Sequence, residues 1–312
     1  MRDSDFISVI MPAFNSEAYI REAIDSVVQQ TWPRWELIVV DDGSTDGTKD
    51  NVAKYVLEDD RIRYIHQDNS GPASARNTGI QASRYPYIAF LDSDDIWFHD
   101  KLEKQMNFAV THPGHVVYGG ARYLWGKDGT FTEDDSAKIY RNFDTIPENA
   151  EYFLFHPNLT MTSSILLEKS MLEKVGRFDQ TLSSSEDDDL YFRLALNYKF
   201  HALQEPVFYR RRHTENITAN LTSKEIRRNR YRAVENIVMR TPQELLPKPK
   251  SHILSYWALW FSKVALEKGR HAASMGWFLK GFLISPAYYF SRLRRKAGKR
   301  LGKNRFHPGN AD

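Results

Sequence analysis

Residues 92 to 95, Asp-Ser-Asp-Asp, place three carboxylates directly after an apolar run of the chain. Carboxylates this close in sequence repel one another and lower stability unless a cation is present. Mg²⁺ and Mn²⁺ prefer oxygen ligands, and they commonly combine one or two carboxylates with oxygens of a bound phosphate. The alternative is a solvated acidic turn that caps a helix beginning near Phe98. The cluster predicts a divalent-cation site for a phosphorylated ligand.

Polar residues also follow the other apolar runs of the first hundred residues. One run ends in Pro-Ala-Phe-Asn at 12 to 15, and the next in Asp-Asp-Gly-Ser-Thr-Asp at 41 to 46. A helix N-cap accounts for the last two residues of the second segment, but not for Asp41 and Asp42. Arg76 falls in the first turns of a predicted helix, where a cation is mildly unfavourable to the dipole but well placed to meet an anionic ligand. An ordinary surface arginine is the alternative.

The elements that must position these residues alternate between two periods. Short continuous apolar runs are typical of strands buried on both faces, and apolar residues three or four apart are typical of helices packed by one side. This alternation predicts an α/β architecture, a mostly parallel sheet flanked by helices. Ligands bind at the carboxyl ends of such strands, so the polar segments are expected to meet at one edge. The predicted strands are 7–11, 37–40, 62–65 and 87–91, and the predicted helices are 18–28, 48–57 and 72–82.

The rest of the chain predicts a mixed region followed by helices alone. After about residue 240 the pattern is helical only, and three prolines between 242 and 249 mark a linker. We therefore predict a first domain over residues 1–222 and a basic, helical C-terminal extension over 223–312. In the mixed region we expect a hairpin at 116–125 and 130–140, a strand at 162–167, a helix at 188–197 and a strand at 200–203.

Four ordered motifs amount to a family resemblance: PAFN at 12–15, ELIVVDDGSTDGT at 36–48, NSGPASARNTGI at 69–80 and YIAFLDSDDIW at 87–97. On these motifs the segment from about 6 to 215 resembles family 2 glycosyltransferases of the GT-A fold. The resemblance implies inverting transfer of a sugar from a nucleotide-diphosphate donor, with UDP-sugar favoured, to a hydroxyl of a glycan or lipid-linked acceptor. It also implies a role in cell-surface polysaccharide synthesis and a divalent cation, Mn²⁺ or Mg²⁺, held by a DxD-type motif. Nucleotide-sugar binding would fall to residues 6–110, and the acceptor and catalytic part to 111–222.

The resemblance also implies places for the donor-binding residues. Arg76 would approach the base or the diphosphate, Asp92 would meet the ribose with Ser93 beside it, and Asp94 would bind the metal. His213 lies in a later segment similar to R-x-H-x-x-N-x-S/T; it could complete the metal site or bond the diphosphate, and is otherwise a surface residue. The residues expected beside the nucleotide are Pro12, Asn15, Glu17 and Asp41 or Asp42, with one of the two aspartates bonding the base.

A second acidic segment, Glu-Asp-Asp-Asp at 186 to 189, matches the Glu-Asp pair that this family carries ahead of an amphipathic helix. Inverting transfer needs one carboxylate near the acceptor hydroxyl, to take its proton as the oxygen attacks. We assign this general base to Asp187, with Glu186 or Asp188 as alternatives in register. The alternative for the segment is an acidic helix start favoured by the helix dipole, which applies to Asp188 and Asp189 in any case.

The net charge of +3 conceals a strong asymmetry. Residues 224–312 hold 20 Lys and Arg against 5 Asp and Glu, a charge of +15, and the preceding 223 residues carry −12. Eight cations between 292 and 305 follow the aromatic cluster Tyr288, Tyr289 and Phe290, a combination that suits an anionic membrane surface. The alternatives are a packed helical hairpin with a solvated tail, and a nucleic-acid ligand, although no recognition fold accompanies this segment.

Composition excludes several other classes. The 312 residues are 41% hydrophobic, too apolar for a disordered protein, and the absence of cysteine excludes a disulfide scaffold, a zinc-thiolate site and a Cys nucleophile. The start lacks the apolar run of a signal peptide, and no stretch near the C-terminus reaches the roughly 20 apolar residues that span a bilayer. We expect a cytoplasmic protein that can bind peripherally at the cytoplasmic face of the membrane.

Three rival functions are weighed by the same residues. A sugar-1-phosphate nucleotidyltransferase would need a Gly-rich basic loop after the first strand, where this chain has Pro-Ala-Phe-Asn. A dinucleotide-dependent dehydrogenase is excluded because no G-x-G-x-x-G follows any predicted strand. The non-enzyme rival is a sugar-nucleotide-binding or membrane scaffold that has lost catalysis, and the intact acids at 92–95 and 186–189 argue against it.

Overall fold

The structure is a computed structural model of the 312-residue chain and describes residues 5–125, 130–132, 142–143, 145–155, 161–182, 185–212 and 223–291. The chain divides into two compact units, Met1–Ala233 and Val234–Asp312. The division falls inside helix α9 (Ser223–Arg240), whose first half carries Arg230. The guanidinium of Arg230 forms an ion pair with Asp188 at 2.7 Å, so this half of the helix belongs to the first unit.

Nine strands from the described part of the first unit form one sheet, in the order β3-β2-β1-β4-β8-β6-β9-β5, with β7 paired to β6. The pairs β3-β2, β2-β1 and β1-β4 are parallel, which confirms the α/β class predicted from the alternating pattern. The strands are β1 (Ile7–Ala13), β2 (Trp35–Asp41), β3 (Ile62–His66), β4 (Tyr87–Phe90), β5 (Ile96–Trp97), β6 (His115–Trp125), β7 (Thr130–Thr132), β8 (Leu166–Glu168) and β9 (Lys199–Arg212).

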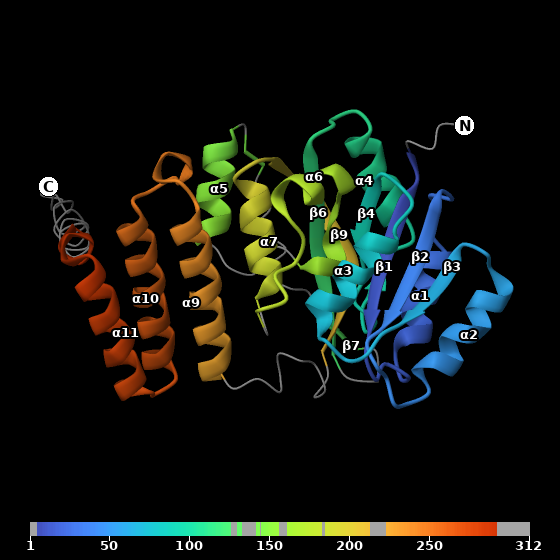
Figure 1. The fold of residues 1–312 in the computed structure, drawn as a ribbon, viewed down its shortest axis with the longest axis horizontal. Helices are drawn as coiled ribbons and strands as arrows, with labels where there is room; N and C mark the ends of the chain where they lie inside the picture. Colours follow the sequence, from blue (N-terminus) through green and yellow to red (C-terminus); the bar gives the residue numbers. More distant parts are fainter. Residues whose placement is uncertain are drawn as a thin grey trace, which may run out of the picture. The chain divides into compact units, whose positions relative to one another are not determined.

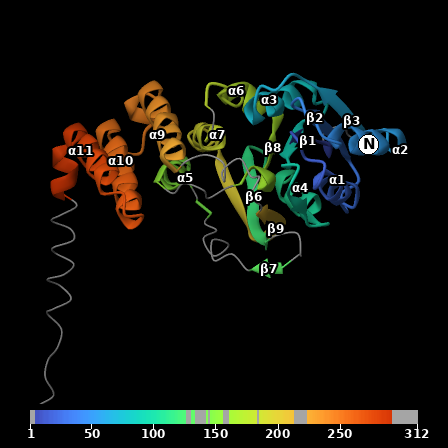
Figure 2. The same ribbon diagram turned by 90° about the horizontal axis from the view of Figure 1, so that it is seen from below.

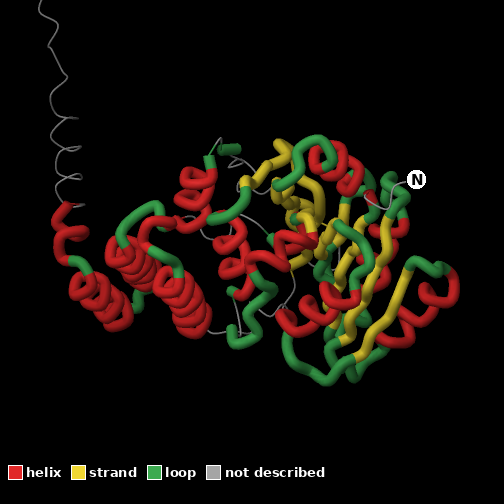
Figure 3. Tube along the Cα trace, turned by 45° about the horizontal axis from the view of Figure 1, so that its top comes forward, coloured by secondary structure: helices red, strands yellow, loops and turns green. Residues whose placement is uncertain are grey.

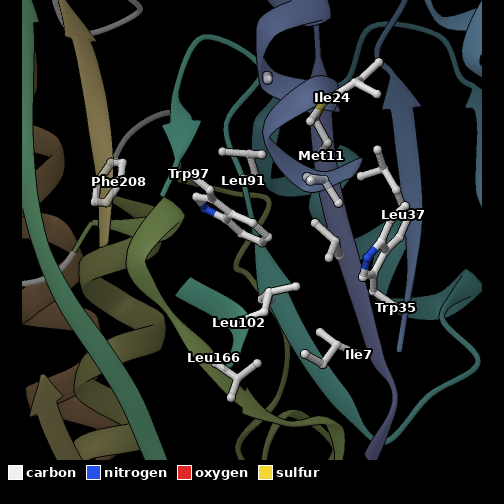
Figure 4. Packing of buried hydrophobic residues seen from close by; sticks show 14 of the residues in the cluster. Ile7, Met11, Ile24, Trp35, Leu37, Leu91, Trp97, Leu102, Leu166 and Phe208 are labelled. Carbon is white, nitrogen blue, oxygen red and sulfur yellow. The ribbon is translucent and has the colours of Figure 1, made fainter. Parts of the chain in front are cut away.

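Helices cover both faces of this sheet (Figure 1, Figure 2). Residues 7, 9 and 11 of β1 belong to one hydrophobic core, shared with α1, α2 and α4, whereas Ile10 belongs to a second core, shared with α3, α6 and α7. In the first core, Met11 and Leu37 pack near Ile24 (Figure 4). The helices are α1 (Ile20–Val28), α2 (Thr48–Glu58), α3 (Pro72–Ala82), α4 (Lys101–Ala109), α5 (Ile146–Phe155), α6 (Lys169–Val175) and α7 (Glu186–Ala195).

Close packing of α3 on β1 depends on a glycine. A Cβ atom added at Gly79 would lie 2.4 Å from Cγ2 of Ile10, so a larger residue would push the helix off the strand. Arg76 lies one turn before Gly79 on the same helix. The distance between α3 and the sheet therefore determines how deeply the Arg76 side chain is buried.

The mixed half of the sheet differs from the sequence prediction in two places. A 3-10 turn, η3 (Thr162–Ser164), occupies the start of the strand expected at 162–167, and β8 begins only at Leu166. The strand expected at 200–203 is instead the long β9, because its polar centre, residues 204 to 206, hides it from a hydrophobicity pattern. A register shift between β6 and β9 near Gly120 and Pro206 accommodates that centre. The predicted hairpin partner at 133–140 lies outside the described residues.

The described part of the second unit is helical, with η4 (Gln243–Leu245), α10 (Lys250–Glu267) and α11 (His271–Ile284) following the end of α9. Figure 3 shows helices and loops, but no strand, in the α10 and α11 region. α10 and α11 approach closely at Gly281, where an added Cβ would lie 2.9 Å from Cβ of Ala258. No helix among the described residues is both long and apolar enough to cross a membrane.

Lys101 at the start of α4 gives a first testable expectation about stability. Its side chain is fully buried; Nζ donates to Oε1 of Gln105 at 2.6 Å and lies 4.0 Å from the ring centroid of Trp97. Burial lowers the pKa of Lys101 well below its ordinary value of 10.5, so the unfolded chain holds this proton more tightly than the folded chain does. The contribution of Lys101 to stability therefore rises with pH from its lowered pKa up to its unfolded pKa.

We expect Lys101→Met to abolish this rise. The free energy of unfolding of the wild type, taken relative to that of the variant, should increase between pH 7 and pH 10, because Lys101 in the wild type has a lowered pKa in the folded state. The hydrogen bond to Gln105, which only the variant lacks, adds a roughly constant offset to this difference and does not produce the rise with pH. Denaturant unfolding of both proteins at several pH values checks the expectation, and a difference that stays constant with pH would contradict it.

Candidate active site

The segments that follow β1, β2 and β4 meet at one edge of the sheet, as expected for parallel neighbours. Asp41 is the last residue of β2, and the acidic segment 92–95 comes directly after β4 and Leu91. Ser16, after β1, and Ser93 join two of these segments, because their Oγ atoms lie 2.7 Å apart. The structure therefore brings together segments that are up to 80 residues apart in the printed sequence.

The segments after β1 and β2 are bound to each other by hydrogen bonds in both directions. The N–H of Asn15 donates to Oγ of Ser44 at 2.9 Å, and Oδ1 of Asn15 accepts from the N–H of Thr45 at 2.9 Å. The carboxylate of Glu17 accepts from the N–H of Gly47 at 3.0 Å. Asn15 has φ 48°, a left-handed conformation that asparagine tolerates. Asn15 and Glu17 both remain exposed at this junction, where a ligand can reach them.

Asp41 and Asp42 are buried and already accept several hydrogen bonds. Oδ2 of Asp41 accepts from the hydroxyl of Tyr64 at 2.6 Å. Asp42 ties the segment after β2 to the segment after β3, and carboxylates still have lone pairs for a ligand after such bonds. Pro12 is buried within β1 and lies opposite Val40, the residue directly before Asp41. The donors to Asp42 are Nε2 of Gln67 at 2.7 Å, the N–H of Ser70 at 2.9 Å and the N–H of Gly71 at 2.8 Å.

Arg76 joins the two acidic motifs. Its Nη2 donates to Oδ1 of Asp92 at 2.8 Å, and its Nη1 donates to Oε1 of Glu186 at 2.8 Å. Arg76 is 6% exposed, and its Nε has no hydrogen-bond partner among the described residues. Burial alone would lower the pKa of this guanidinium, but the charges of Asp92 and Glu186 outweigh burial and raise it. A buried donor without a partner is uncommon in a folded protein.

The acidic segment 92–95 divides into buried and accessible carboxylates. Asp95 is 4% exposed and accepts from Oγ of Ser163 at 2.5 Å, while Oγ of Ser163 also accepts from the N–H of Asp92 at 3.1 Å. Burial, and then the charges of Asp94 and Asp92, raise the pKa of Asp95 well above 3.8. Asp92 and Asp94 are only partly buried. Burial and like charge thus both act on Asp95, whereas Asp92 and Asp94 are left accessible to a ligand.

The residues at 186–189 open helix α7, and three of the four have a basic partner. Glu186 pairs with Arg76, Asp188 pairs with Arg230 at 2.7 Å, and Asp189 pairs with Arg193 at 2.6 Å. Asp187 is half-buried and has no basic partner among the described residues; its Oδ1 accepts from the N–H of Asp188 at 2.8 Å. Burial and the charge of Asp187 raise the pKa of Glu186 above 4.5, although Arg76 opposes this.

The residues present fit a divalent cation that is held partly by its ligand. Across the described part of the chain, no group of three or more His, Cys, Asp and Glu side chains is arranged to enclose a metal ion. Mg²⁺ does not require such a cage, because it is usually bound by one or two carboxylates with phosphate oxygens and waters. A cation bound beside Asp92 and Asp94 would offset the repulsion between these neighbouring carboxylates. His213, predicted either to complete the metal site or to bond the diphosphate, lies outside the described residues.

Sequence reasoning missed two buried residues that hold the acidic segment in place. Ser163 bridges Asp92 and Asp95 from the turn η3, and no pattern in the sequence marked it. Arg211 at the end of β9 is 6% exposed; its Nε donates to the carbonyl of Asp94 at 3.2 Å, and its Nη2 donates to Glu22 at 2.8 Å. The sequence motif of this segment predicts a role for His213 but none for Arg211.

Comparison with known proteins identifies the family to which this arrangement belongs. Residues 8–175, more than half of the chain, match the family model described as "Glycosyl transferase family 2". The chain belongs to this family. It superposes on the crystal structure of S. aureus TarS 1-349 in complex with UDP-GlcNAc with a TM-score of 0.67 and 23% sequence identity, covering 88% of this chain and 81% of that one. The likeness shows the GT-A fold that the motifs predicted.

Two relatives illustrate the range of sequence similarity. The chain is 44% identical over 125 residues to the Bacillus subtilis protein described as putative teichuronic acid biosynthesis glycosyltransferase TuaG. The matched segment covers 40% of this chain and 49% of TuaG. It is 32% identical over 213 residues to glycosyltransferase GlyA of Streptococcus pneumoniae, which covers 66% of this chain and 29% of that protein. The matches span about half of TuaG and under a third of GlyA, so these similarities extend to only part of each relative.

Proposed function

We propose that this protein is an inverting glycosyltransferase that moves a sugar from a nucleotide-diphosphate donor, with a UDP-sugar favoured, to a hydroxyl of a glycan or lipid-linked acceptor. The observation that carries the proposal is the position of Arg76, which pairs with Asp92 of one acidic motif and with Glu186 of the other. This arginine holds the expected donor acids next to the expected general base. Transfer in a single displacement needs both groups at one place.

Asp187 is the residue best suited to take the proton of the acceptor hydroxyl. Neighbouring acids on α7 are engaged with arginines, whereas Asp187 is half-buried and has no basic partner among the described residues. A general base must be ionised and within hydrogen-bond reach of the proton that it removes. A carboxylate already held by an arginine is less free to meet an acceptor hydroxyl, so the member of the series without a basic partner among the described residues is the stronger candidate. Glu186 and Asp188 remain the alternatives in register.

The donor is proposed to lie along the edge formed by the segments after β1, β2 and β4. Asn15 and Glu17 are exposed there, Asp41 or Asp42 would bond the base, and Asp92 with Ser93 would face the ribose. Arg76 would approach the base or the diphosphate, as the family resemblance implies. Asp94 would hold Mn²⁺ or Mg²⁺, and His213 would complete the metal site or bond the diphosphate. The cation would supply a Lewis acid that offsets charge on the leaving diphosphate.

The comparisons support the choice of substrate class. TuaG is described as a teichuronic acid biosynthesis enzyme, and TarS has been crystallised with UDP and with UDP-GlcNAc. We extend these to the present chain as a UDP-sugar donor and a role in cell-surface polysaccharide synthesis. Both extensions rest on similarity. The assignments of Arg76 and Asp187 also began from the family resemblance, and the contacts of these residues in this chain support them.

Asp94→Ala is expected to abolish the part of UDP affinity that depends on Mn²⁺ and to leave the fold intact. The reason is that Asp94 is a partly exposed carboxylate in the segment that follows β4, next to Asp92 and the buried Asp95. Calorimetric titration of UDP with and without Mn²⁺ measures the effect. Asp60→Ala, the same change at an exposed position before β3, is the matched control and should behave as the wild type. Unchanged UDP affinity of the Asp94 variant in Mn²⁺ would overturn this assignment.

A further inference from the structure

One side of α11 presents apolar side chains to solvent. Met275, Phe278, Leu279 and Leu283 follow one another at helical spacing, and they are 59%, 40%, 50% and 77% exposed. Large exposed apolar patches are uncommon on monomeric soluble proteins and usually mark an interaction site. We call these four residues, together with Phe290, the α11 stripe.

The stripe continues past the end of α11. Phe290 is 57% exposed, and its ring centroid lies 6.1 Å from that of Phe282 on α11. Tyr289 behaves differently from the expectation that it would enter a membrane with its neighbours: it is 5% exposed, and its hydroxyl donates to the carbonyl of Phe278 at 3.3 Å. Tyr289 therefore fixes this segment against α11 and leaves Phe290 outside.

The unit that carries the stripe has a positive net charge. Residues 234–312 contain 15 Lys and Arg against 4 Asp and Glu, a net charge of +11, and α11 itself carries Lys280 and no acidic residue. Eight of the cations occur in sequence directly after Phe290, between 292 and 305. A positively charged apolar surface is disfavoured as a contact with a second copy of itself, because like charges would be brought together. It is complementary to an anionic surface.

We propose that the α11 stripe docks on an anionic phospholipid bilayer. Its apolar side chains would enter the boundary between headgroups and acyl chains, as in helices that lie in the membrane interface. The cations that follow the stripe would be attracted to the anionic headgroups, an attraction that weakens as salt rises. This surface belongs to the second unit alone and does not depend on the transfer reaction proposed for the first.

Vesicle co-sedimentation of the full chain tests the proposal. The probes are vesicles of phosphatidylcholine alone, and vesicles in which about one third of the lipid is phosphatidylglycerol. We expect the wild type to sediment with the anionic vesicles and only weakly with the neutral ones. Leu283→Glu should lower the partition coefficient by about tenfold or more. It removes a leucine side chain that the bilayer would bury, and it adds a charge that the lipid would repel. A chain ending at Ser291 should lose the part of the binding that is sensitive to salt.

Leu57→Glu is the matched control, since Leu57 on α2 is 88% exposed and lies in the other unit. It should bind vesicles as the wild type does, and all variants should keep the wild-type UDP affinity. Equal sedimentation of Leu283→Glu and Leu57→Glu would overturn the proposal. So would a wild type that fails to bind anionic vesicles, or light scattering that shows an oligomer dispersed by Leu283→Glu without any vesicle binding. The last result would identify the stripe as a contact between copies of the chain.

Discussion

Asp187→Asn is expected to lower the rate of sugar transfer by about 10² to 10⁴ and to leave donor binding unchanged, because an amide keeps the shape of the side chain but cannot accept a proton. The variant should fold normally, since Asp187 forms no ion pair with a basic residue in the described part of the chain. The measurement is the release of nucleoside diphosphate in the presence of acceptor, together with calorimetric titration of UDP.

The neighbouring acids supply the controls for this assignment. Asp188→Asn removes a partly buried ion pair with Arg230 and should lower stability with little effect on turnover per folded molecule. Glu186→Gln should disturb both, because Glu186 holds Arg76. If Asp187→Asn keeps near-normal turnover and one of the other two does not, the general base is that residue and the register proposed here is wrong.

Arg76→Met is expected to be the most destabilising single change at this edge of the sheet, at about 3–5 kcal/mol, because it leaves buried charge without a partner. Glu186 is 8% exposed and would lose the positive charge that now stabilises its ionised form. The free energy of unfolding, measured by denaturant titration, should recover in part when Glu186→Gln is added, since the second change removes the unpaired carboxylate.

Lys104 offers a matched comparison for Arg76. It also bridges two carboxylates, Asp100 and Glu205, at 2.9 Å and 2.8 Å, but its side chain is 30% exposed. Exposed ion pairs contribute about 0–1 kcal/mol, so Lys104→Met should cost no more than that. Two results would contradict this account: similar losses of stability for Arg76→Met and Lys104→Met, or no recovery of stability in the Arg76→Met/Glu186→Gln variant. Either would show that the contribution of Arg76 to stability does not come from its burial between two acids.

The sequence was sufficient to predict the architecture where local pattern and long-range packing agree. The alternation of apolar runs and helical faces predicted β1 to β4 and the helices between them, because strands buried on both faces leave a continuous apolar signal. It failed for β9, whose polar centre at 204–206 interrupts that signal although the strand continues to Arg212. It also failed at 162–164, where the chain forms a turn that delivers Ser163 to the acidic segment.

The candidate site was predictable in its residue types but not in its connections. Carboxylates at strand ends and an arginine at a helix start are visible in the sequence. That Arg76 reaches Asp92, 16 residues away, and Glu186, 110 residues away, depends on how α3 and α7 pack against the same face of the sheet. Arg211 fixes the backbone of Asp94 across 117 residues for the same kind of reason. Local patterns carry no information on pairings at such separations.

The release of nucleoside diphosphate from a panel of nucleotide-sugars, with Mn²⁺ present, tests the central claim most directly. Slow donor hydrolysis suffices for the test, so no acceptor has to be known. We predict that the wild-type protein releases nucleoside diphosphate from one class of donor, UDP-sugars, and that Asp94→Ala and Asp187→Asn each strongly lower the release while both variants remain folded. In hydrolysis, water takes the place of the acceptor hydroxyl, and Asp187 would take its proton. Release from no member of the panel by the folded wild type, or release that survives both substitutions, would contradict the proposed function.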